Sequence, residues 1–273
     1  MDRSKPAGQT PRGWVAMRAG VGGAVGALLA ALALAACGGA PAQHQAQSSS
    51  ASSAAAVAAT PGLDCVAGQA ATGATGTAPQ EPDAGVNSVG GACWTKIAGT
   101  PITANVIRTA PAGTSASWKA AWSKTTKDLY IWTDVHTGRK LINSNQQNPW
   151  EDDTVEIYLG GADDHSGAYG PNTGQLVVNS IGLTDLTLGS DHTNLPTVGA
   201  TAHETQSATG YTILLIMPLS NLKAAPASGT KMAFSVGVDY PGTGATSRAG
   251  QTMWQGTSTN WNNDSAWGTL VLG

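Results

Sequence analysis

Charged side chains are scarce in this sequence. They make up 11% of the 273 residues, and the formal net charge at pH 7 is −3. Residues 1–36 hold four of the basic residues and one acid, so the remainder carries a formal charge of −6. Proteins that bind nucleic acids gather Lys and Arg into patches that neutralise phosphates. We therefore expect no nucleic-acid partner.

Long apolar runs are rare too, since only one occurs, at Ala19–Ala36. Basic residues precede it, and Leu34-Ala35-Ala36-Cys37 closes it. Such a segment is typical of a secretory signal, and its end resembles the lipobox of bacterial lipoproteins. The resemblance implies cleavage after residue 36, a lipid on Cys37, and an exported protein anchored to the cell envelope, at the outer membrane or cell surface. The alternative is an uncleaved membrane anchor with an incidental cysteine.

Cysteine is nearly absent from the rest of the chain. Besides Cys37 there are Cys65 and Cys93. Export implies an oxidising compartment, so we expect these two to form a disulfide. No CxxC spacing or histidine pair accompanies them, which argues against a zinc site.

The composition divides the remaining chain into three parts. Residues 37–62 are rich in Ala, Ser and Gln, with too few apolar side chains to fold, and are expected to be a disordered tether. Residues 63–92 are rich in Gly and Ala and are expected to be pinned by the disulfide. Residues 93–273 contain eight of the nine tryptophans and form the predicted domain, which we expect to be monomeric.

No run with helical periodicity of useful length occurs, whereas short apolar or alternating segments separated by turn residues are frequent. This pattern predicts an all-β fold, a β-sandwich of antiparallel strands. The predicted strands are Leu129–Val135, Thr154–Gly160, Gln175–Ile181, Leu183–Leu188, Tyr211–Met217, Met232–Val238 and Thr269–Leu272. Tyr211–Met217 is apolar on both faces, which predicts a central strand, and one helical turn is expected at Pro218–Leu222.

The stretch Asn148–Leu159, NPWEDDTVEIYL, combines a tryptophan, four acids and an alternating run. Val155, Ile157 and Leu159 share one strand face, and Glu156 lies on the other. This stretch resembles the signature of family 9 carbohydrate-binding modules, sugar-binding sandwiches found beside xylanases and other glycan enzymes. The order of the later segments, ending in residues 261–270, agrees with the family. The resemblance covers roughly residues 93–273.

The resemblance implies a carbohydrate ligand and a non-catalytic role. In the family two tryptophans sandwich a sugar ring at the end of a glycan chain, and the matching residues are Trp150 and Trp261. The matching acid is Glu156, which accepts hydrogen bonds from hydroxyls. Gln175 and Asn179 share a face of the next predicted strand and are expected to join the site. The other tryptophans in strand-like settings are expected in the core, namely Trp118, Trp122, Trp132, Trp254 and Trp267.

Two further expectations follow from the resemblance. Family members can carry a basic residue where this chain has Val177, and Arg139 or Lys140 could compensate. Relatives often hold a structural calcium ion, and Asp163 and Asp164 are candidate ligands because hard cations prefer oxygen.

Two other classes of protein compete with this interpretation. A glycosidase needs two separated carboxyl groups, but Asp153 and Glu156 should point to opposite sides of a strand. The HExxH and GxSxG motifs are absent. A haem-binding electron-transfer sandwich would need axial ligands, although no CxxCH occurs. The candidates would be Met217, Met232 and Met253 with His136, His165, His192 and His203.

Overall fold

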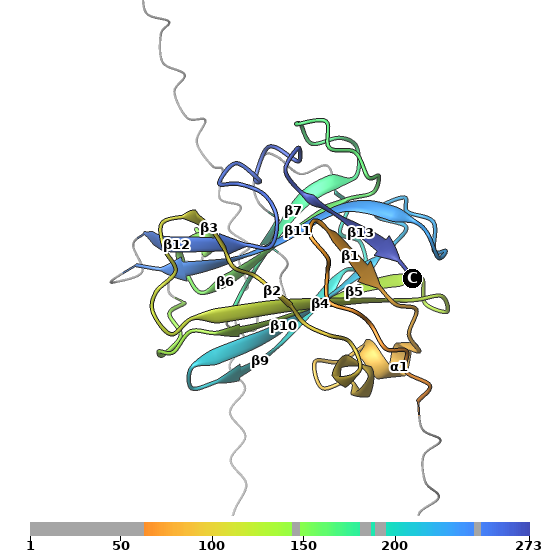
Figure 1. The fold of residues 1–273 in the computed structure, drawn as a ribbon, viewed down its shortest axis with the longest axis horizontal. Coiled ribbons are helices and arrows are strands. Elements are labelled where there is room, and N and C mark those ends of the chain that lie inside the picture. The colour runs from red at the N-terminus through yellow and green to blue at the C-terminus, as the bar shows by residue number, and fades with distance from the viewer. Residues whose placement is uncertain (1–62, 144–147, 181–186, 189–194, 243–246) are drawn as a thin grey trace, which may run out of the picture. The chain divides into compact units, whose positions relative to one another are not determined.

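Strands account for nearly all of the regular structure, and they form two sheets packed face to face, so the predicted antiparallel β-sandwich is confirmed (Figure 1). The strands are β1 (Thr75–Ala78), β2 (Thr100–Pro101), β3 (Ala104–Ile107), β4 (Ser115–Ser123), β5 (Asp128–His136), β6 (Thr154–Gly160), β7 (Thr173–Asn179), β8 (Thr187–Leu188), β9 (Thr201–Ser207), β10 (Gly210–Pro218), β11 (Lys231–Pro241), β12 (Arg248–Met253) and β13 (Gly268–Leu272). The short helices are α1 (Asp83–Val86), η1 (Ala92–Thr95) and η2 (Pro149–Glu151).

The computed structural model describes residues 63–143, 148–180, 187–188, 195–242 and 247–273. The predicted signal segment 1–36, the tether 37–62 and the lipid site at Cys37 lie outside the described residues. Within the described part of the chain, no helix has the length and apolar character needed to cross a membrane.

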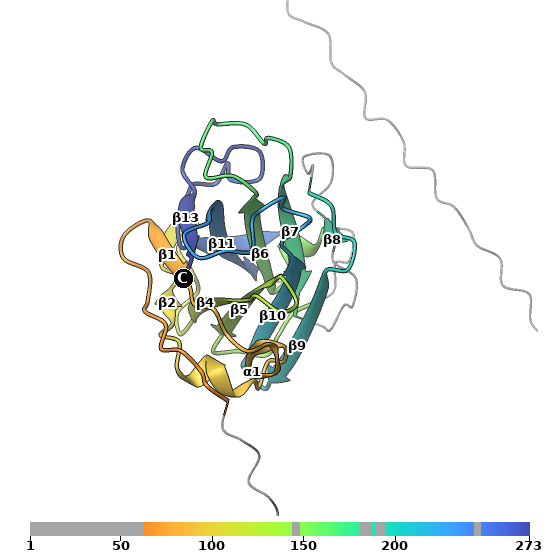
Figure 2. The same ribbon diagram turned by 90° about the vertical axis from the view of Figure 1, so that its right-hand side faces the viewer.

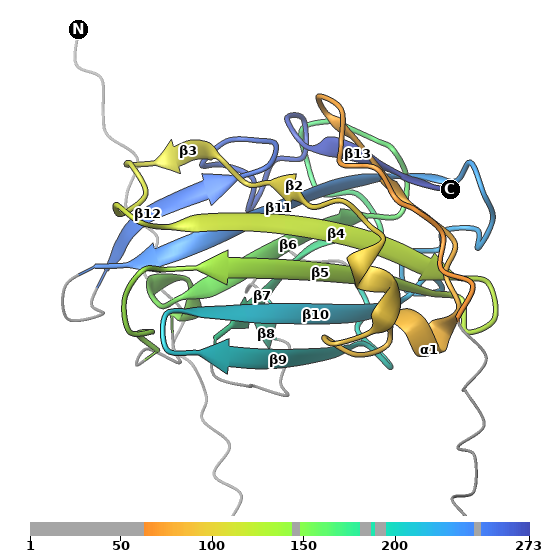
Figure 3. The ribbon, with the colours of Figure 1, turned by 60° about the horizontal axis from the view of Figure 1, so that its bottom comes forward.

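The two sheets differ in size and in strand order. The smaller sheet has the strand order β2-β4-β5-β10-β9 and is seen face-on in Figure 3. The larger sheet runs β1-β13-β11-β6-β7-β8, and β12 and β3 extend it from β11. Among the described strands every pairing is antiparallel except that of β1 with β13. Figure 2 shows the two layers from another side.

The core between the sheets follows from the alternation of side chains along each strand. Val155, Ile157 and Leu159 of β6 point into it and are fully buried. On β10, Ile213 enters this core, while Leu214 packs in a second apolar cluster against the segment that carries α1 and η1. Because β10 is covered on both faces and lies between β5 and β9, its apolar character on both sides is explained.

Tryptophans fill much of the interior, as expected. Trp118 and Trp122 are four residues apart on β4 and therefore share its inward face, where both are buried. Trp254 also packs in this core, with its ring centroid 4.8 Å from that of Trp118. Trp132 is only partly buried and lies under Lys119, whose Nζ is 4.8 Å from the ring centroid.

Six strands were not predicted: β1, β2, β3, β4, β9 and β12. The first three are only two to four residues long. The sequences of the other three, SASWKAAWS, TAHETQS and RAGQTM, are dominated by Ala, Ser and polar residues. Such residues have low strand propensity, and pairing with neighbouring strands outweighs it here. Strand β7 begins two residues earlier than predicted. Of the predicted strand Leu183–Leu188, only β8 is described, and Pro218–Leu222 forms hydrogen-bonded turns instead of a helix.

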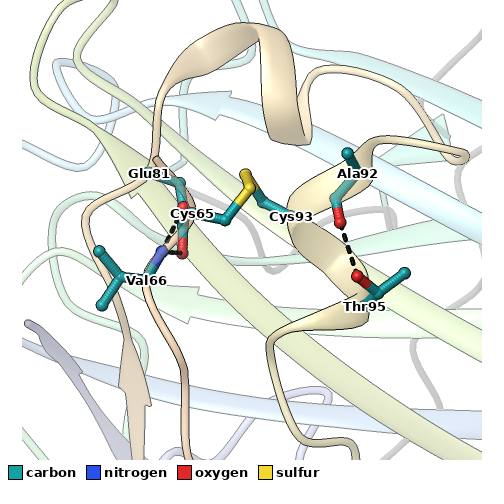
Figure 4. Close-up of a disulfide and its surroundings, with 6 residues drawn as sticks. All are labelled: Cys65, Val66, Glu81, Ala92, Cys93 and Thr95. Atoms are coloured by element: carbon teal, nitrogen blue, oxygen red, sulfur yellow. Dashed lines mark hydrogen bonds between the residues drawn. A yellow bond between two sulfur atoms is a disulfide. The ribbon is translucent and has the colours of Figure 1, made fainter. Parts of the chain in front are cut away.

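Residues 63–99 are tied to the sandwich by β1, which pairs in parallel with β13, and by backbone hydrogen bonds with Trp122 of β4. Within this segment, the predicted disulfide between Cys65 and Cys93 is present (Figure 4). Beside it, the carboxylate of Glu81 accepts the backbone N–H of Val66 at 3.0 and 3.1 Å. Burial raises the pKa of Glu81, although this hydrogen bond opposes the shift.

We predict that removing the disulfide, by replacing both Cys65 and Cys93 with alanine, lowers the free energy of unfolding. The two cysteines are 28 residues apart. In the chain-entropy model a loop of this size is worth about 3–4 kcal/mol. Urea unfolding of both proteins measures the difference. Two thiols that titrate in the folded, unreduced wild-type protein would contradict the bridge.

Candidate functional site

The face of the larger sheet that points away from the core carries the polar residues of the candidate site. Glu156 on β6 lies between Val177 of β7 and Gly237 of β11. Tyr158, two residues further along β6, lies opposite Gln175. The alternation of β6 that buries its apolar residues on one side therefore brings these polar groups together on the other.

Glu156 is buried, and three side chains donate hydrogen bonds to it. Its side chain is 2% exposed. Arg248 donates from Nη2 to Oε1 at 3.0 Å, and Gln251 donates from Nε2 to Oε2 at 2.7 Å. The hydroxyl of Tyr158 also donates to Oε2. A buried carboxylate needs such compensation for its lost hydration, so Glu156 is not a solvated strand charge.

A second buried carboxyl group, that of Asp239 on β11, lies beside the first. Arg248 contacts both, since its Nε is 3.1 Å from Oδ1 of Asp239. Burial and the negative charge of Glu156 raise the pKa of Asp239 well above its usual value, while Arg248 opposes the shift. Burial lowers the pKa of Arg248, but the charges of Asp239 and Glu156 outweigh it and the pKa is raised. The guanidinium therefore stays charged.

Trp150 and Trp261 are far apart in the sequence but border the same pocket. Trp150 belongs to η2, which begins with Pro149, a favoured residue at the first position of a helical turn. Its ring is partly buried. Trp261 is 44% exposed and lies in the loop before β13. Its neighbour Asn260 is buried and fixes that loop by accepting the N–H of Thr257 at 2.8 Å.

This loop depends on a glycine. Gly256 has φ +113°, a conformation that other residues rarely adopt, and a Cβ there would lie 2.1 Å from Nδ2 of Asn260. Asn260 Nδ2 donates to the carbonyl of Gln255 at 3.1 Å, and the carbonyl of Asn260 accepts the hydroxyl of Tyr169 at 2.7 Å. The position of Trp261 is thus set by the residues before it.

Aromatic side chains pack together next to the pocket, on the face of the larger sheet that points away from the core. The rings of Tyr158 and Tyr169 each lie 5.3 Å from that of Trp267, and Met253 packs with them. The loop between β6 and β7 and the loop before β13, which supply Tyr169 and Trp267, lie side by side over the sheet (Figure 1). The polar floor around Glu156 is therefore bounded on this side.

Together these elements form a pocket of about 500 Å³. It is lined by Ile107, Trp150, Glu151, Glu156, Tyr158, Gln175, Ser247, Arg248, Gln251, Ser258 and Trp261. Four of the five predicted carbohydrate-binding residues, Trp150, Trp261, Glu156 and Gln175, line it together. Asn179 does not: it is buried opposite Thr154, and its Nδ2 donates to Asn143 at 3.1 Å.

The basic residue that lines the pocket is neither of the two that were expected to compensate for Val177. Arg139 donates to both carboxylate oxygens of Asp153 at 2.8 Å, and neither Arg139 nor Lys140 lines the pocket. Arg248 supplies the guanidinium instead. It approaches Glu156 from β12, on the opposite side of β6 from β7.

Sequence reasoning missed Arg248, Gln251 and Asp239. Gln251 lies opposite Asp239 in the pairing of β12 with β11, and that register shifts at Tyr240/Pro241. The sequence carried one usable signal, an acid within the apolar run of β11. Arg248 and Gln251 are 92 and 95 residues from Glu156, so nothing local links them to it.

The calcium candidates do not by themselves build a cation site. Oδ1 of Asp163 accepts the hydroxyl of Thr269 at 2.7 Å and lies 3.0 Å from Nε2 of His165, and Asp164 is exposed. In the described ranges, the one group of three potential metal ligands is Cys65, Glu81 and Cys93, and its two sulfurs are joined in the disulfide. Calcium binding stays a prediction without an assigned ligand set.

The methionines considered as haem ligands are packing residues. Met217 and Met232 are buried in the main core, and Met253 is buried in the aromatic cluster of the outer face. His192 lies outside the described residues. Asp153 and Glu156 have separate partners, Arg139 and Arg248, as expected for residues on opposite sides of a strand.

Comparison with known proteins agrees with this architecture. The family model described as "Carbohydrate family 9 binding domain-like" matches residues 86–273. Because the match spans more than half of the chain, the chain belongs to this family, whose members are non-catalytic binding modules.

Individual relatives are more distant. The chain is 27% identical over 173 residues to endo-1,4-beta-xylanase A of Thermoanaerobacterium saccharolyticum, a match to 63% of this chain but 14% of the xylanase. Two structures of a family 9 module from Caldicellulosiruptor kristjanssonii, with glucose and with cellotriose, superpose with a TM-score of 0.59 at 20% identity. They cover 73% and 72% of this chain and 95% and 93% of theirs. At this identity the superposition establishes the shared fold.

We predict that Asp153→Asn strongly destabilises the protein. Asp153 is fully buried, and besides Arg139 it accepts the N–H of Ile142 at 2.6 Å. Loss of its charge leaves Arg139 without a counter-ion, which should cost about 3 kcal/mol in urea unfolding. Asp134→Asn is the control, because Asp134 is exposed and accepts from Thr212 at 2.8 Å, and its cost should stay below about 1 kcal/mol. Equal losses in both variants would refute the structural role of the pair.

Proposed function

We propose that this chain is a non-catalytic module that binds a glycan or oligosaccharide at the pocket between Trp150 and Trp261. One observation carries the proposal: two tryptophans that are far apart in the sequence border one 500 Å³ pocket with a polar floor. Membership of the carbohydrate family 9 binding domain-like family supports it.

The chemistry of the pocket suits a sugar ring. A pyranose has apolar C–H patches on its faces and hydroxyl groups around its edge. The rings of Trp150 and Trp261 can cover the faces, since aromatic side chains supply large apolar contact with defined geometry. The hydroxyls can then exchange hydrogen bonds with the floor, where Glu156, Gln175 and Arg248 lie.

The choice of ligands to test follows from the relatives. The structures from Caldicellulosiruptor kristjanssonii contain glucose and cellotriose, and the xylanase relative acts on a β-1,4-linked xylan, as its name states. Glucose, cellotriose and xylotriose therefore form the first panel. Comparing cellotriose with its borohydride-reduced form tests whether the pocket holds the end of the glycan chain.

Localisation is the second part of the proposal. The segment Leu34-Ala35-Ala36-Cys37 supports an exported lipoprotein whose sugar-binding domain is tethered to the cell envelope. In this arrangement the lipid holds the protein at the membrane, and the domain holds the glycan close to the cell surface.

We predict that Trp150→Ala and Trp261→Ala each weaken binding about ten- to a hundredfold, because each removes one face of the stacking contact. Calorimetric titration of the ligand panel measures the loss. Trp261→Ala should leave the melting temperature nearly unchanged, since the ring is 44% exposed.

Two control variants separate binding from folding. Trp132→Ala removes a partly buried tryptophan on the smaller sheet and should leave affinity unchanged. Ile157→Ala should lower the free energy of unfolding by about 2–5 kcal/mol while the folded fraction still binds. If Trp150→Ala binds as tightly as wild type but melts much lower, Trp150 is a structural residue and the proposed slot is wrong.

We predict that Cys37→Ser abolishes lipid labelling of the full-length protein in a bacterial host, because the thiol is the group that would carry the lipid. Metabolic labelling with a fatty-acid analogue measures it, and the unchanged Cys65–Cys93 pair serves as the internal check on folding. Labelling that persists in Cys37→Ser would overturn the lipoprotein assignment.

A further inference from the structure

Arg248 lines the pocket beside Glu156 and is the one Lys or Arg among its described lining residues. Its side chain is 20% exposed, whereas those of Glu156 and Asp239 are 2% and 0% exposed. Of these three ionisable groups, the guanidinium is therefore the one that a ligand in the pocket can reach most easily.

Two of the three guanidinium nitrogens are already engaged. Nη2 donates to Glu156 at 3.0 Å, and Nε donates to the carbonyl of Trp150 at 3.2 Å and lies 3.1 Å from Asp239. Among the described residues nothing accepts a hydrogen bond from Nη1. Since a guanidinium has five N–H donors in a fixed planar arrangement, the two N–H groups of Nη1 are held in one orientation and remain available.

Glu156, in contrast, has little accepting capacity left. A carboxylate has about four lone-pair positions. Arg248, Gln251 and Tyr158 occupy three of them. A sugar hydroxyl would have to displace one of these donors to bond directly to Glu156.

We propose that Arg248 is the specificity-determining hydrogen-bond donor of the sugar slot, donating from Nη1 to a ring hydroxyl, and that Glu156 and Asp239 are positioning residues that hold its guanidinium in place. This inference rests on the proposed carbohydrate-binding function and assigns its polar contact to a strand, β12, that is distant from β6 in the sequence. The carbonyl of Trp150 ties the same guanidinium to the wall of the slot.

The charge balance of the floor also defines the class of sugar. The positive charge of Arg248 is matched by Glu156 alone, and Glu151 lines the same pocket. The carboxylates would repel an anionic sugar such as a uronic acid, and the described lining of the pocket has no unpaired cation to offset this repulsion. A neutral sugar is not repelled, so the slot should prefer neutral glycans.

The test is a double-mutant cycle on binding, measured by calorimetry with cellotriose and glucose. Arg248→Gln should weaken binding at least tenfold, and Arg248→Lys should recover only part of this loss, because an ammonium group cannot bond to Glu156, Trp150 and a ligand in the same fixed geometry. Glu156→Gln should also weaken binding. The decisive variant combines Arg248→Gln with Glu156→Gln.

If Glu156 acts through Arg248, the double variant binds no more weakly than Arg248→Gln alone, because interacting residues are not additive. If the two losses add, Glu156 contacts the sugar itself and the positioning role is wrong. In the double variant Glu156 is not left as an unpaired buried carboxylate, because its charge is removed together with that of Arg248. Asp239 also loses Arg248, but burial already raises its pKa, so it can become protonated. Thermal melts with and without ligand confirm that each variant is folded.

The remaining outcomes separate this inference from the proposed function. Wild-type binding together with unchanged affinity in Arg248→Gln rejects the role of Arg248 and leaves the sugar slot standing. Tighter binding of glucuronic acid than of glucose by the wild type rejects the preference for neutral sugars. If the wild type binds no sugar of the panel, the proposed function and this inference both fail.

Discussion

The burial of one carboxylate organises the outer face of the larger sheet. Moving a charge out of water is costly unless several donors replace its hydration. Glu156 obtains them from its own strand, through Tyr158, and from β12, through Arg248 and Gln251. Those donors reach Glu156 only if β12 pairs with β11 in the observed register. The hydrogen bonds that stabilise the buried charge of Glu156 therefore depend on the pairing of β12 with β11.

Strand β6 contributes side chains to both the core and the pocket, and the sequence pattern predicted which residues take each face. The alternation in Asn148–Leu159 correctly placed Val155 and Ile157 in the core and Glu156 on the opposite face. Trp150 was assigned to the site from the resemblance to family 9 modules, and it lines the pocket together with Glu156. The division of the strand into two faces is local information, since the period of a strand fixes which side chains share a face.

Other parts of the site depend on pairing that local sequence does not encode. Arg248 begins β12, a strand too polar to be recognised, and the register shift at Tyr240/Pro241 determines where its side chain lies. Arg139 is closer to Glu156 in sequence and was the more natural candidate for the cation, yet Asp153 binds it on the other side of β6. Strand β4 was missed for a related reason, because its Ala and Ser residues gain their strand conformation from neighbours on both sides.

The arrangement of the acids also separates binding from hydrolysis. A glycosidase requires two carboxyl groups roughly 5–10 Å apart, with room between them for the scissile bond or a water molecule. Glu156 and Asp239 both contact one guanidinium, at 3.0 and 3.1 Å. Both acids are thus engaged in holding Arg248, which agrees with the non-catalytic character of the family.

The floor of the slot is built on paired strands, whereas one of its walls, Trp261, stands on a loop. The floor residues belong to paired strands, so hydrogen bonds on both sides of β6 and β11 fix their positions. Trp261, in contrast, stands on a loop whose shape depends on Gly256 and Asn260. Changes in that loop can alter the spacing of the two rings without disturbing the sheet or the core. Strand pairing thus holds the hydrogen-bonding floor, whereas the spacing of the two rings depends on the shape of one loop.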